Sequence, residues 1–279
     1  MRSAHRPVKL AEALRNNWLE VWYQPKISLK SLTVCGAEAL IRACHPDYGV
    51  IEPAELLPQA GDPLYKPLSF FVLRQAVADW VAFADRGFAH RLSINIPASI
   101  LSTPEFVDLA RRTIPRVPGF PGVIIEVTED EFSGDPGWMR EVATQLKLYN
   151  AWISLDDFGT AYSSLSRLAD LPFIELKLDR SFVFNCAIDK RKHALCQMVV
   201  DLARRFGAAS CAEGVETADD LQCVAKPGFD TAQGYFFAKA MPSDQFLEFF
   251  HSYNGRKEAD ITSAVGSEVR TRKRLGEAL

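Results

Sequence analysis

Two adjacent aspartates, Asp156 and Asp157, end a short apolar run that begins at Trp152. The following residues, 158–160, read Phe-Gly-Thr and break the run into a loop. A strand that delivers carboxylates at its C-terminal end is a common way for an α/β protein to build a site. Neighbouring carboxylates repel each other, and a divalent cation between them would remove that repulsion. A solvated strand end with an Asx-type turn explains the same residues, so this pair alone leaves both interpretations open.

Further polar residues stand where the other predicted strands end. In chain order they are Glu38, Asn95, Glu126, Glu129, Lys177, Asp179, Glu213, Glu216 and Gln233. Because the C-terminal ends of parallel barrel strands lie on one face, we expect these side chains to meet there. Any one of these acids could instead cap a helix or pair with a basic residue. Such separate roles do not readily explain why polar residues stand at the ends of so many strands.

The types of these residues indicate which cation they would bind. Carboxylate oxygens with an amide, and without Cys or His, favour hard ions such as Mg²⁺ or Mn²⁺ over zinc. The acids are numerous enough for two ions that share one carboxylate, an arrangement suited to phosphoryl chemistry. Lys177 would then orient the attacking water or neutralise developing charge.

Strands and helices alternate along the chain, which predicts an α/β fold with a parallel sheet closed into a TIM-like (β/α)8 barrel. The first two strands are separated by a short turn, too short for a parallel crossover, so the first strand is expected to run antiparallel. Pro25 restricts that first strand to an end or an edge at this position. The predicted strands are residues 20–27, 33–41, 91–96, 123–127, 152–155, 174–178, 208–212 and 231–237. The predicted helices are residues 10–19, 53–59, 68–84, 106–114, 138–148, 163–168, 193–206, 219–225 and 243–253, and residues 42–50 are predicted as a polar loop.

Composition narrows the possible classes of function. The chain has 279 residues with a net charge of -3, which argues against a protein that binds a nucleic acid polymer. No apolar run approaches the roughly 20 residues of a membrane span, and the N-terminus lacks the apolar core of a secretory signal. The six cysteines contain no C-x-x-C pair, so we interpret them as buried small residues in a reducing cytoplasm rather than a zinc site or disulfide framework.

The domain organisation is predicted as one barrel with two flanking segments. Residues 1–17 form a lead-in helix, residues 18–253 the barrel, and residues 254–279 a charged, mobile tail that contains Arg270–Arg274. No sensory domain is expected before the barrel, which leaves a stand-alone enzyme and a fragment of a larger one as alternatives.

At the residues described above, the chain resembles the EAL domain phosphodiesterases, which hydrolyse cyclic di-GMP and are named for a Glu-Ala-Leu triplet. The resemblance extends from about Trp18 to Phe250 and rests on eight motifs in the family's order. They are YQP at 23–25, EALIR at 38–42, Asn95, EVTE at 126–129, DDFGT at 156–160, KLD at 177–179, AEGVE at 212–216 and QGY at 233–235.

The resemblance implies roles for particular residues. One Mg²⁺ or Mn²⁺ ion would be held by Glu38, Asn95, Glu126 and Asp156, and a second by Asp156, Asp157 and Glu213. Lys177 would contact the catalytic water, with Glu38 and Glu216 as further catalytic or supporting residues. Glu129 would anchor the loop after Asp157. Contacts to the dinucleotide are implied for Gln24, Ile41, Arg42, Asp179, Gln233 and Tyr235. The product would be linear pGpG, Ca²⁺ would inhibit, and the enzyme would be a homodimer.

Two readings of the function follow from this resemblance. The first is a metal-dependent cyclic di-GMP phosphodiesterase, and the second is a catalytically silent EAL domain that acts as a cyclic di-GMP receptor or a protein-interaction module. The full set of metal-ligand residues favours the enzyme. The sequence departs from the family at Ala161, where a glycine is usual, in the loop through which the family couples dimer contacts to activity.

Overall fold

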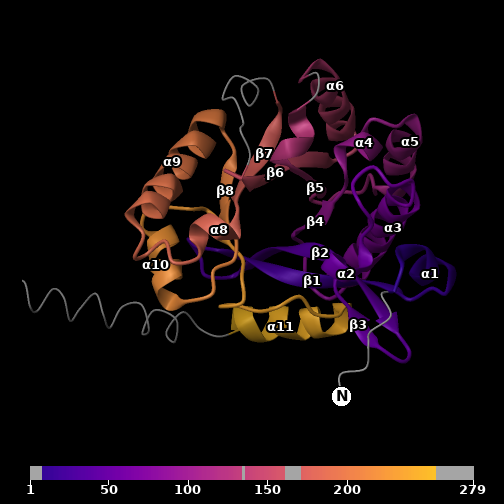
Figure 1. Cartoon of the computed structure of the whole chain (residues 1–279), viewed down its shortest axis with the longest axis horizontal. Coiled ribbons are helices and arrows are strands. Elements are labelled where there is room, and N and C mark those ends of the chain that lie inside the picture. The colour runs from indigo at the N-terminus through magenta and orange to yellow at the C-terminus, as the bar shows by residue number, and fades with distance from the viewer. Residues whose placement is uncertain (1–7, 134–135, 161–170, 256–279) are drawn as a thin grey trace, which may run out of the picture.

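The computed structural model describes residues 8–133, 136–160 and 171–255, and its strands form a ring with helices around the outside (Figure 1). Eight strands of the described chain close this ring, so the predicted barrel is confirmed. In ring order they are β1 (Leu19–Ser28), β2 (Val34–His45), β4 (Arg91–Asn95), β5 (Val123–Thr128), β6 (Ala151–Phe158), β7 (Phe173–Leu178), β8 (Ala209–Ala212) and β9 (Thr231–Ala232).

Strand β1 runs antiparallel to both of its neighbours, β2 and β9, as the short connection after Ser28 predicts. The remaining neighbours in the ring, from β2 through β4 to β9, pair in parallel. Their C-terminal ends therefore lie on one face of the barrel, which is where such folds build their sites.

Pro25 lies inside β1 and not at its end, so of the two predicted positions, a strand end or an edge, the local edge is the one found. The N–H of Tyr23 donates to the carbonyl of Met241, so Pro25, two residues further on, turns its nitrogen to the same side of the strand. On that side β9 pairs with β1 only at Ile27 and Ser28. The missing proline N–H thus falls in a gap of the ladder, where no donor is required.

Two corrections concern the chain after β2 and the last strand. Residues 42–50 were predicted as a loop, but β2 continues to His45 and turns back into β3 (Gly49–Ile51), with Gly49 in the left-handed region at φ 73°. The predicted strand over residues 231–237 is reduced to Thr231–Ala232.

Helices cover the outside of the ring (Figure 1). Those with eight or more residues are α3 (Tyr65–Ala84), α5 (Pro104–Thr113), α6 (Pro136–Lys147), α9 (Lys190–Phe206), α10 (Ala218–Ala225) and α11 (Ser243–Gly255). The shorter ones are α1 (Leu10–Arg15), α2 (Pro53–Leu56), α4 (Ala98–Leu101), η1 (Glu129–Ser133) and α8 (Arg180–Val183). The sequence did not predict α4, η1 or α8, since a single turn carries too little periodicity to be recognised. The helix predicted at 163–168 lies outside the described residues, and none of the described helices is long and apolar enough to cross a membrane.

The barrel interior below the mouth contains a buried ion pair. The Lys26 ammonium lies 2.6 Å from a Glu175 carboxylate oxygen, and both side chains are about 5% exposed. Ser154 also donates to Glu175, and Lys26 contacts Ser93. Glu175 is two residues before Lys177 on β7, so strand alternation points both side chains into the barrel at successive levels.

The Lys26–Glu175 pair gives a test of the barrel interior. Replacing Lys26 with Met leaves Glu175 buried without its counter-charge, which should lower the free energy of unfolding by roughly 3–5 kcal/mol. Chemical denaturation measures this loss, and the double variant Lys26→Met with Glu175→Gln should recover much of it. The matched control is Lys66→Met, because Lys66 pairs with Glu105 at 2.9 Å on the exposed surface and should matter little. Equal effects of the two lysine substitutions would contradict the role assigned to the buried pair.

Candidate active site

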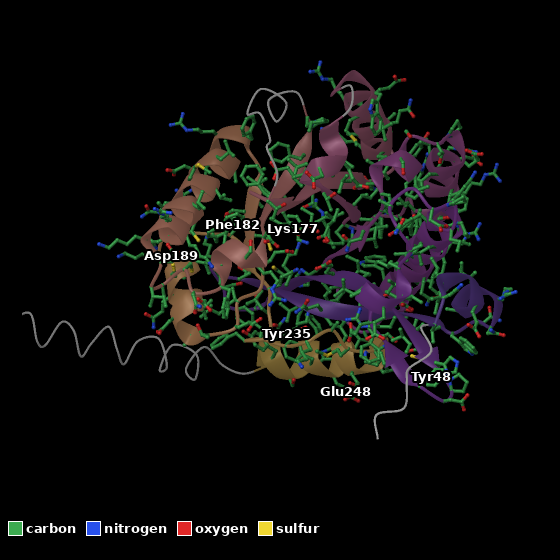
Figure 2. The ribbon with its side chains drawn as sticks, viewed as in Figure 1. Tyr48, Lys177, Phe182, Asp189, Tyr235 and Glu248 are labelled. Carbon is green, nitrogen blue, oxygen red and sulfur yellow. The ribbon has the colours of Figure 1, made fainter. Side chains whose placement is uncertain are left out.

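The predicted site residues surround the ammonium group of Lys177, which is fully buried in the ring of strands (Figure 2). Its Nζ lies 2.6 Å from Glu213 Oε1, 2.9 Å from Glu126 Oε2 and 3.1 Å from Asp156 Oδ1. Glu38 Oε2 is slightly further away at 3.7 Å. Acids from four parts of the chain that are far apart in the sequence therefore converge on one lysine of β7.

Two amide side chains fix the orientation of the acids. Asn95 Nδ2 donates to Glu38 Oε1 at 2.8 Å, and Gln233 Nε2 donates to Glu38 Oε2 at 2.6 Å. The same Gln233 nitrogen also lies 2.9 Å from Glu213 Oε1. Glu38 is thus held on both oxygens by β4 and by the segment after β9.

The pKa values of the clustered acids are shifted in different directions. Burial opposes ionisation of Glu38, yet Lys177, Asn95 and Gln233 hold its pKa below the ordinary value. Burial, reinforced by Glu38, raises the pKa of Glu126 well above the ordinary value. Burial, reinforced by Asp156, raises the pKa of Glu213 to about 8 and that of Asp157 to about 6. Burial opposes the charge of Lys177, but the surrounding carboxylates raise its pKa well above the usual range. The metal-free site therefore retains protons at neutral pH.

The cluster fits the binding of divalent cations. One oxygen from each of Glu38, Glu126 and Asp156 lies within 4.8 Å of the others, and the same holds for Asp156, Asp157 and Glu213. Asp156 belongs to both groups, as the sequence predicts for a shared ligand. Both carboxylate oxygens of Glu126 are buried and, apart from their ion-pair contacts with Lys177 and Lys26, have no hydrogen-bond partner among the described residues, so they can coordinate a cation.

Charge counting leads to the same conclusion. When ionised, the five acids of these two groups together with Lys177 carry four negative charges. Two divalent ions would neutralise that excess, and Lys26 is already paired with Glu175 one level below. The chemistry of the donors, all oxygen, selects hard ions.

The loop that follows Asp157 begins in a strained backbone conformation. Asp157 has a positive φ of 53°, and its N–H donates to Asp156 Oδ1 at 3.0 Å. Glu129 accepts a hydrogen bond of 2.9 Å from the N–H of Gly159, which places it where the resemblance assigns a loop anchor. Ala161 and the rest of the loop lie outside the described residues.

A cavity of about 750 Å³ opens directly over the cluster. One part of its wall is acidic, and the opposite part is apolar, formed among others by Ile41, Leu57, Tyr65, Leu68 and Val72. This size falls within the roughly 300–1,000 Å³ range of small-molecule sites. The cavity suits a ligand that carries both anionic groups and flat apolar rings.

Four of the predicted ligand-contact residues line this cavity, namely Gln24, Ile41, Gln233 and Tyr235. Tyr235 stands at the rim with 57% of its surface exposed, and Lys239 Nζ lies 5.0 Å from its ring centre. Two others are not among the lining residues. Arg42 is buried and paired with Glu52 at 2.9 Å, and Asp179 caps α8 through the N–H of Ser181.

Glu216 lines the cavity and pairs with Arg180, a residue that was not identified from the sequence. Arg180 Nη2 lies 3.4 Å from Glu216 Oε1, and both residues border the cavity. Gly214 makes this possible, because a Cβ there would meet Arg180 Cβ at an impossibly short distance. Arg180 follows directly after the KLD motif, so its position next to a strand end was the signal available in the sequence.

Two more polar residues near the site were not identified from the sequence. Glu131 on η1 borders the cavity and accepts from the N–H groups of Ala98 and Thr128. Lys26 lies 3.8 Å from Glu126 Oε1 from below. Lys26 stands two residues after Gln24 in a mostly apolar strand, and this spacing indicates that both face the barrel interior.

The chain is similar in sequence to a known family and to named relatives. The EAL domain model matches residues 8–240. The cyclic di-GMP phosphodiesterase RocR of Pseudomonas aeruginosa is 32% identical over 242 residues, which are 86% of this chain and 62% of RocR. The bifunctional diguanylate cyclase/cyclic di-GMP phosphodiesterase MucR of the same organism is 34% identical over 241 residues, or 85% of this chain and 35% of MucR. The chain thus spans less than two thirds of the length of either relative.

A solved structure gives the same result in three dimensions. The PaMucR phosphodiesterase, in its c-di-GMP complex, matches with a TM-score of 0.79 and 34% identity over 85% of this chain and 97% of that chain. With the family match over residues 8–240 and relatives above 30% identity, the chain belongs to the EAL domain family.

Proposed function

We propose that this chain is a metal-dependent phosphodiesterase that hydrolyses cyclic di-GMP to linear pGpG in bacterial second-messenger signalling. The observation that carries the proposal is the buried carboxylate cluster around Lys177 at the floor of the cavity. Relatives named as cyclic di-GMP phosphodiesterases and a related structure in complex with c-di-GMP support the choice of substrate.

The EAL family typically uses a divalent metal, and we propose two Mg²⁺ or Mn²⁺ ions for this chain. Glu38, Asn95, Glu126 and Asp156 would hold one, and Asp156, Asp157 and Glu213 the other. When bound, such ions activate water and stabilise the leaving oxygen of a phosphodiester. Charge neutralisation of the crowded acids provides the driving force for binding.

The remaining site residues would bind and orient the substrate. Lys177, which has donors but no acceptor, would orient the attacking water by hydrogen bonding and compensate negative charge that develops at phosphorus. The apolar wall around Ile41 and Leu68 would pack against a guanine ring, while Gln24 and Tyr235 offer polar contacts at the rim. Arg42, next to Ile41 in the sequence, forms an ion pair with Glu52.

The location and the assembly of the protein are also proposals. A reducing compartment such as the cytoplasm suits the six cysteines, all of which are free thiols in the structure. A homodimer remains an expectation from the family resemblance.

Turnover of cyclic di-GMP by the purified protein in Mg²⁺ or Mn²⁺ tests the proposal directly. We expect release of pGpG, and we expect Glu38→Ala to lower the rate by orders of magnitude, because Glu38 belongs to the group of acids that would hold one ion. Circular dichroism checks that the variant remains folded, and Glu105→Ala, on the exposed surface, is the matched control. Binding of cyclic di-GMP without turnover in either metal would instead identify a silent receptor domain.

Metal affinity should depend on pH. The raised pKa values of Asp157, about 6, and Glu213, about 8, mean that a cation must displace protons from these groups below those values. The affinity for Mg²⁺ should therefore rise steeply with pH below about pH 6, where both groups are protonated, and less steeply from about pH 6 to about pH 8. Isothermal titration calorimetry measures it, and Glu213→Gln should lose the upper part of this rise. An affinity that is constant over this range would argue against the assigned ligands.

Calcium should inhibit the reaction. Ca²⁺ prefers a larger and less regular shell of 6–8 oxygen ligands at roughly 2.3–2.6 Å than the compact set present here offers. We expect Ca²⁺ to compete with Mg²⁺ and to lower turnover, measured as a Ca²⁺ titration at fixed Mg²⁺. Activation by Ca²⁺ in place of Mg²⁺ would contradict the proposed two-ion site.

A further inference from the structure

Three of the six cysteines gather outside the barrel, although their spacing in the sequence predicts buried small residues rather than a zinc site or disulfide framework. The sulfur atoms of Cys186, Cys196 and Cys223 all lie within 4.8 Å of one another, and each of the three residues is buried. The Nδ1 atom of His193 lies 3.2 Å from the sulfur of Cys223. Three thiols thus form one cluster, with an imidazole beside Cys223 at its edge, and the phosphodiesterase proposal does not use them.

The four donors come from three neighbouring parts of the chain. Cys186 follows α8, with its N–H bonded to the carbonyl of Val183. His193 and Cys196 stand three residues apart on α9 and therefore share one helix face. Cys223 comes from α10.

The helices that carry these donors begin at side-chain caps. Asp189 caps α9 by accepting from the N–H groups of Arg191 and Lys192, and Thr217 caps α10 through the N–H of Asp220. Figure 2 labels Asp189, just before α9, toward the outer side of the molecule at the left, with Phe182 of α8 between it and Lys177.

The donor set and its spacing fit a thiophilic metal. Zinc in structural sites is tetrahedral, with Zn–S bonds of roughly 2.3 Å and Zn–N bonds of roughly 2.0–2.1 Å. Such bonds place the sulfur atoms roughly 3.8 Å apart and a ring nitrogen roughly 3.5 Å from each sulfur. The three sulfur atoms, within 4.8 Å of one another, need only small side-chain adjustments. The His193 ring lies 3.2 Å from the Cys223 sulfur and must turn toward the other two sulfur atoms to complete the tetrahedron.

We propose that Cys186, Cys196, Cys223 and His193 form a structural Zn²⁺ site that joins α8, α9 and α10. The site is independent of the carboxylate centre, which has only oxygen donors and selects hard ions. His193 is partly exposed while the three cysteines are buried, so the imidazole side gives a metal ion its entry path.

The chemistry of binding is an exchange of protons for metal. Three thiol protons pass to solvent, and three zinc–sulfur bonds and one zinc–nitrogen bond form, with no change of oxidation state. A hydrogen bond to Cys196 and burial raise the pKa of Cys186, and burial raises that of Cys223 to about 12, so these thiols are protonated until a metal displaces the protons. With Nδ1 on the metal, Nε2 of His193 carries a proton, and after a flip the Gln197 amide oxygen can accept a hydrogen bond from this N–H, since the amide lies 3.4 Å away.

Such a site would stabilise the half of the barrel that carries two active-site residues. Helix α8 follows β7, which holds Lys177, and α10 follows β8 and Glu213. Joining these helices restrains both connections without a ligand in the active site. The expected effect is therefore on thermal stability, with turnover per folded molecule unchanged.

Cobalt substitution tests the site in the full chain. The metal-free, reduced protein is titrated with Co²⁺ in excess Mg²⁺, which occupies the carboxylate centre. We expect a thiolate-to-cobalt charge-transfer band and tetrahedral d–d absorption that saturate at one equivalent and disappear when Zn²⁺ is added. Oxygen ligands produce no thiolate band, so the result does not depend on whether the phosphodiesterase proposal holds.

Substitutions identify the residues that produce the thiolate-to-cobalt band. Cys196→Ser and Cys223→Ser should lose it, along with the rise in Tm that Zn²⁺ gives the wild type, whereas Cys35→Ser, outside the cluster, should keep both. His193→Gln, at a partly exposed position, should keep a thiolate band with affinity lowered at least about tenfold. Absence of a thiolate band in the wild-type protein overturns the proposal without any variant. An unchanged band in folded Cys196→Ser overturns it as well, because the metal would then be bound elsewhere.

Discussion

The buried ammonium of Lys177 is the point on which the active site depends. It lies within 3.1 Å of carboxylate oxygens from three different strands and 3.7 Å from a fourth. One positive charge cannot balance so many acids, and burial in the barrel removes the water that would otherwise solvate them. The metal-free site responds by retaining protons, and the raised pKa values of Glu126 and Glu213 reflect this. Divalent ions offer the more complete solution, since they neutralise the acids without protonating the groups needed for coordination.

The topology of the barrel brings the residues of this cluster together. Its parallel strands bring Glu38, Asn95, Glu126 and Asp156 to one mouth, and the antiparallel β1 adds Gln24 to the same rim. One level below, the interior is also polar, but there Lys26 and Glu175 neutralise each other. The charges of the lower level therefore cancel, whereas the upper level carries more negative than positive charge. The excess negative charge thus distinguishes the candidate active site from the charge-balanced layer beneath it.

Sequence patterns predicted much of this arrangement because strand ends have a fixed geometric meaning in a parallel barrel. The positions of Asp156, Lys177 and Glu213 follow from that rule alone, and the short turn before β2 was sufficient to predict the antiparallel pair. Local patterns could not show what depends on distant contacts. The pairing of Arg180 with Glu216 requires the close approach at Gly214, and the extension of β2 to His45 depends on β3.

The cysteines show the same limit most clearly. Cys186, Cys196 and Cys223 have no metal-binding spacing along the chain, and only the packing of α8, α9 and α10 brings them together. A motif search therefore finds the oxygen-donor site, whose residues sit at strand ends, and misses the sulfur-donor cluster. The oxygen donors and the sulfur donors differ in hardness, so the two proposed sites would favour different kinds of metal ion.

The central claim is that the acids around Lys177 hold two ions that share Asp156. A crystal structure of the protein soaked in Mn²⁺, with anomalous diffraction recorded at the manganese edge, measures this most directly. The account predicts two anomalous peaks roughly 3.5–4 Å apart, both within bonding distance of Asp156. A single peak, or manganese bound away from Glu38, Glu126 and Asp156, would contradict it.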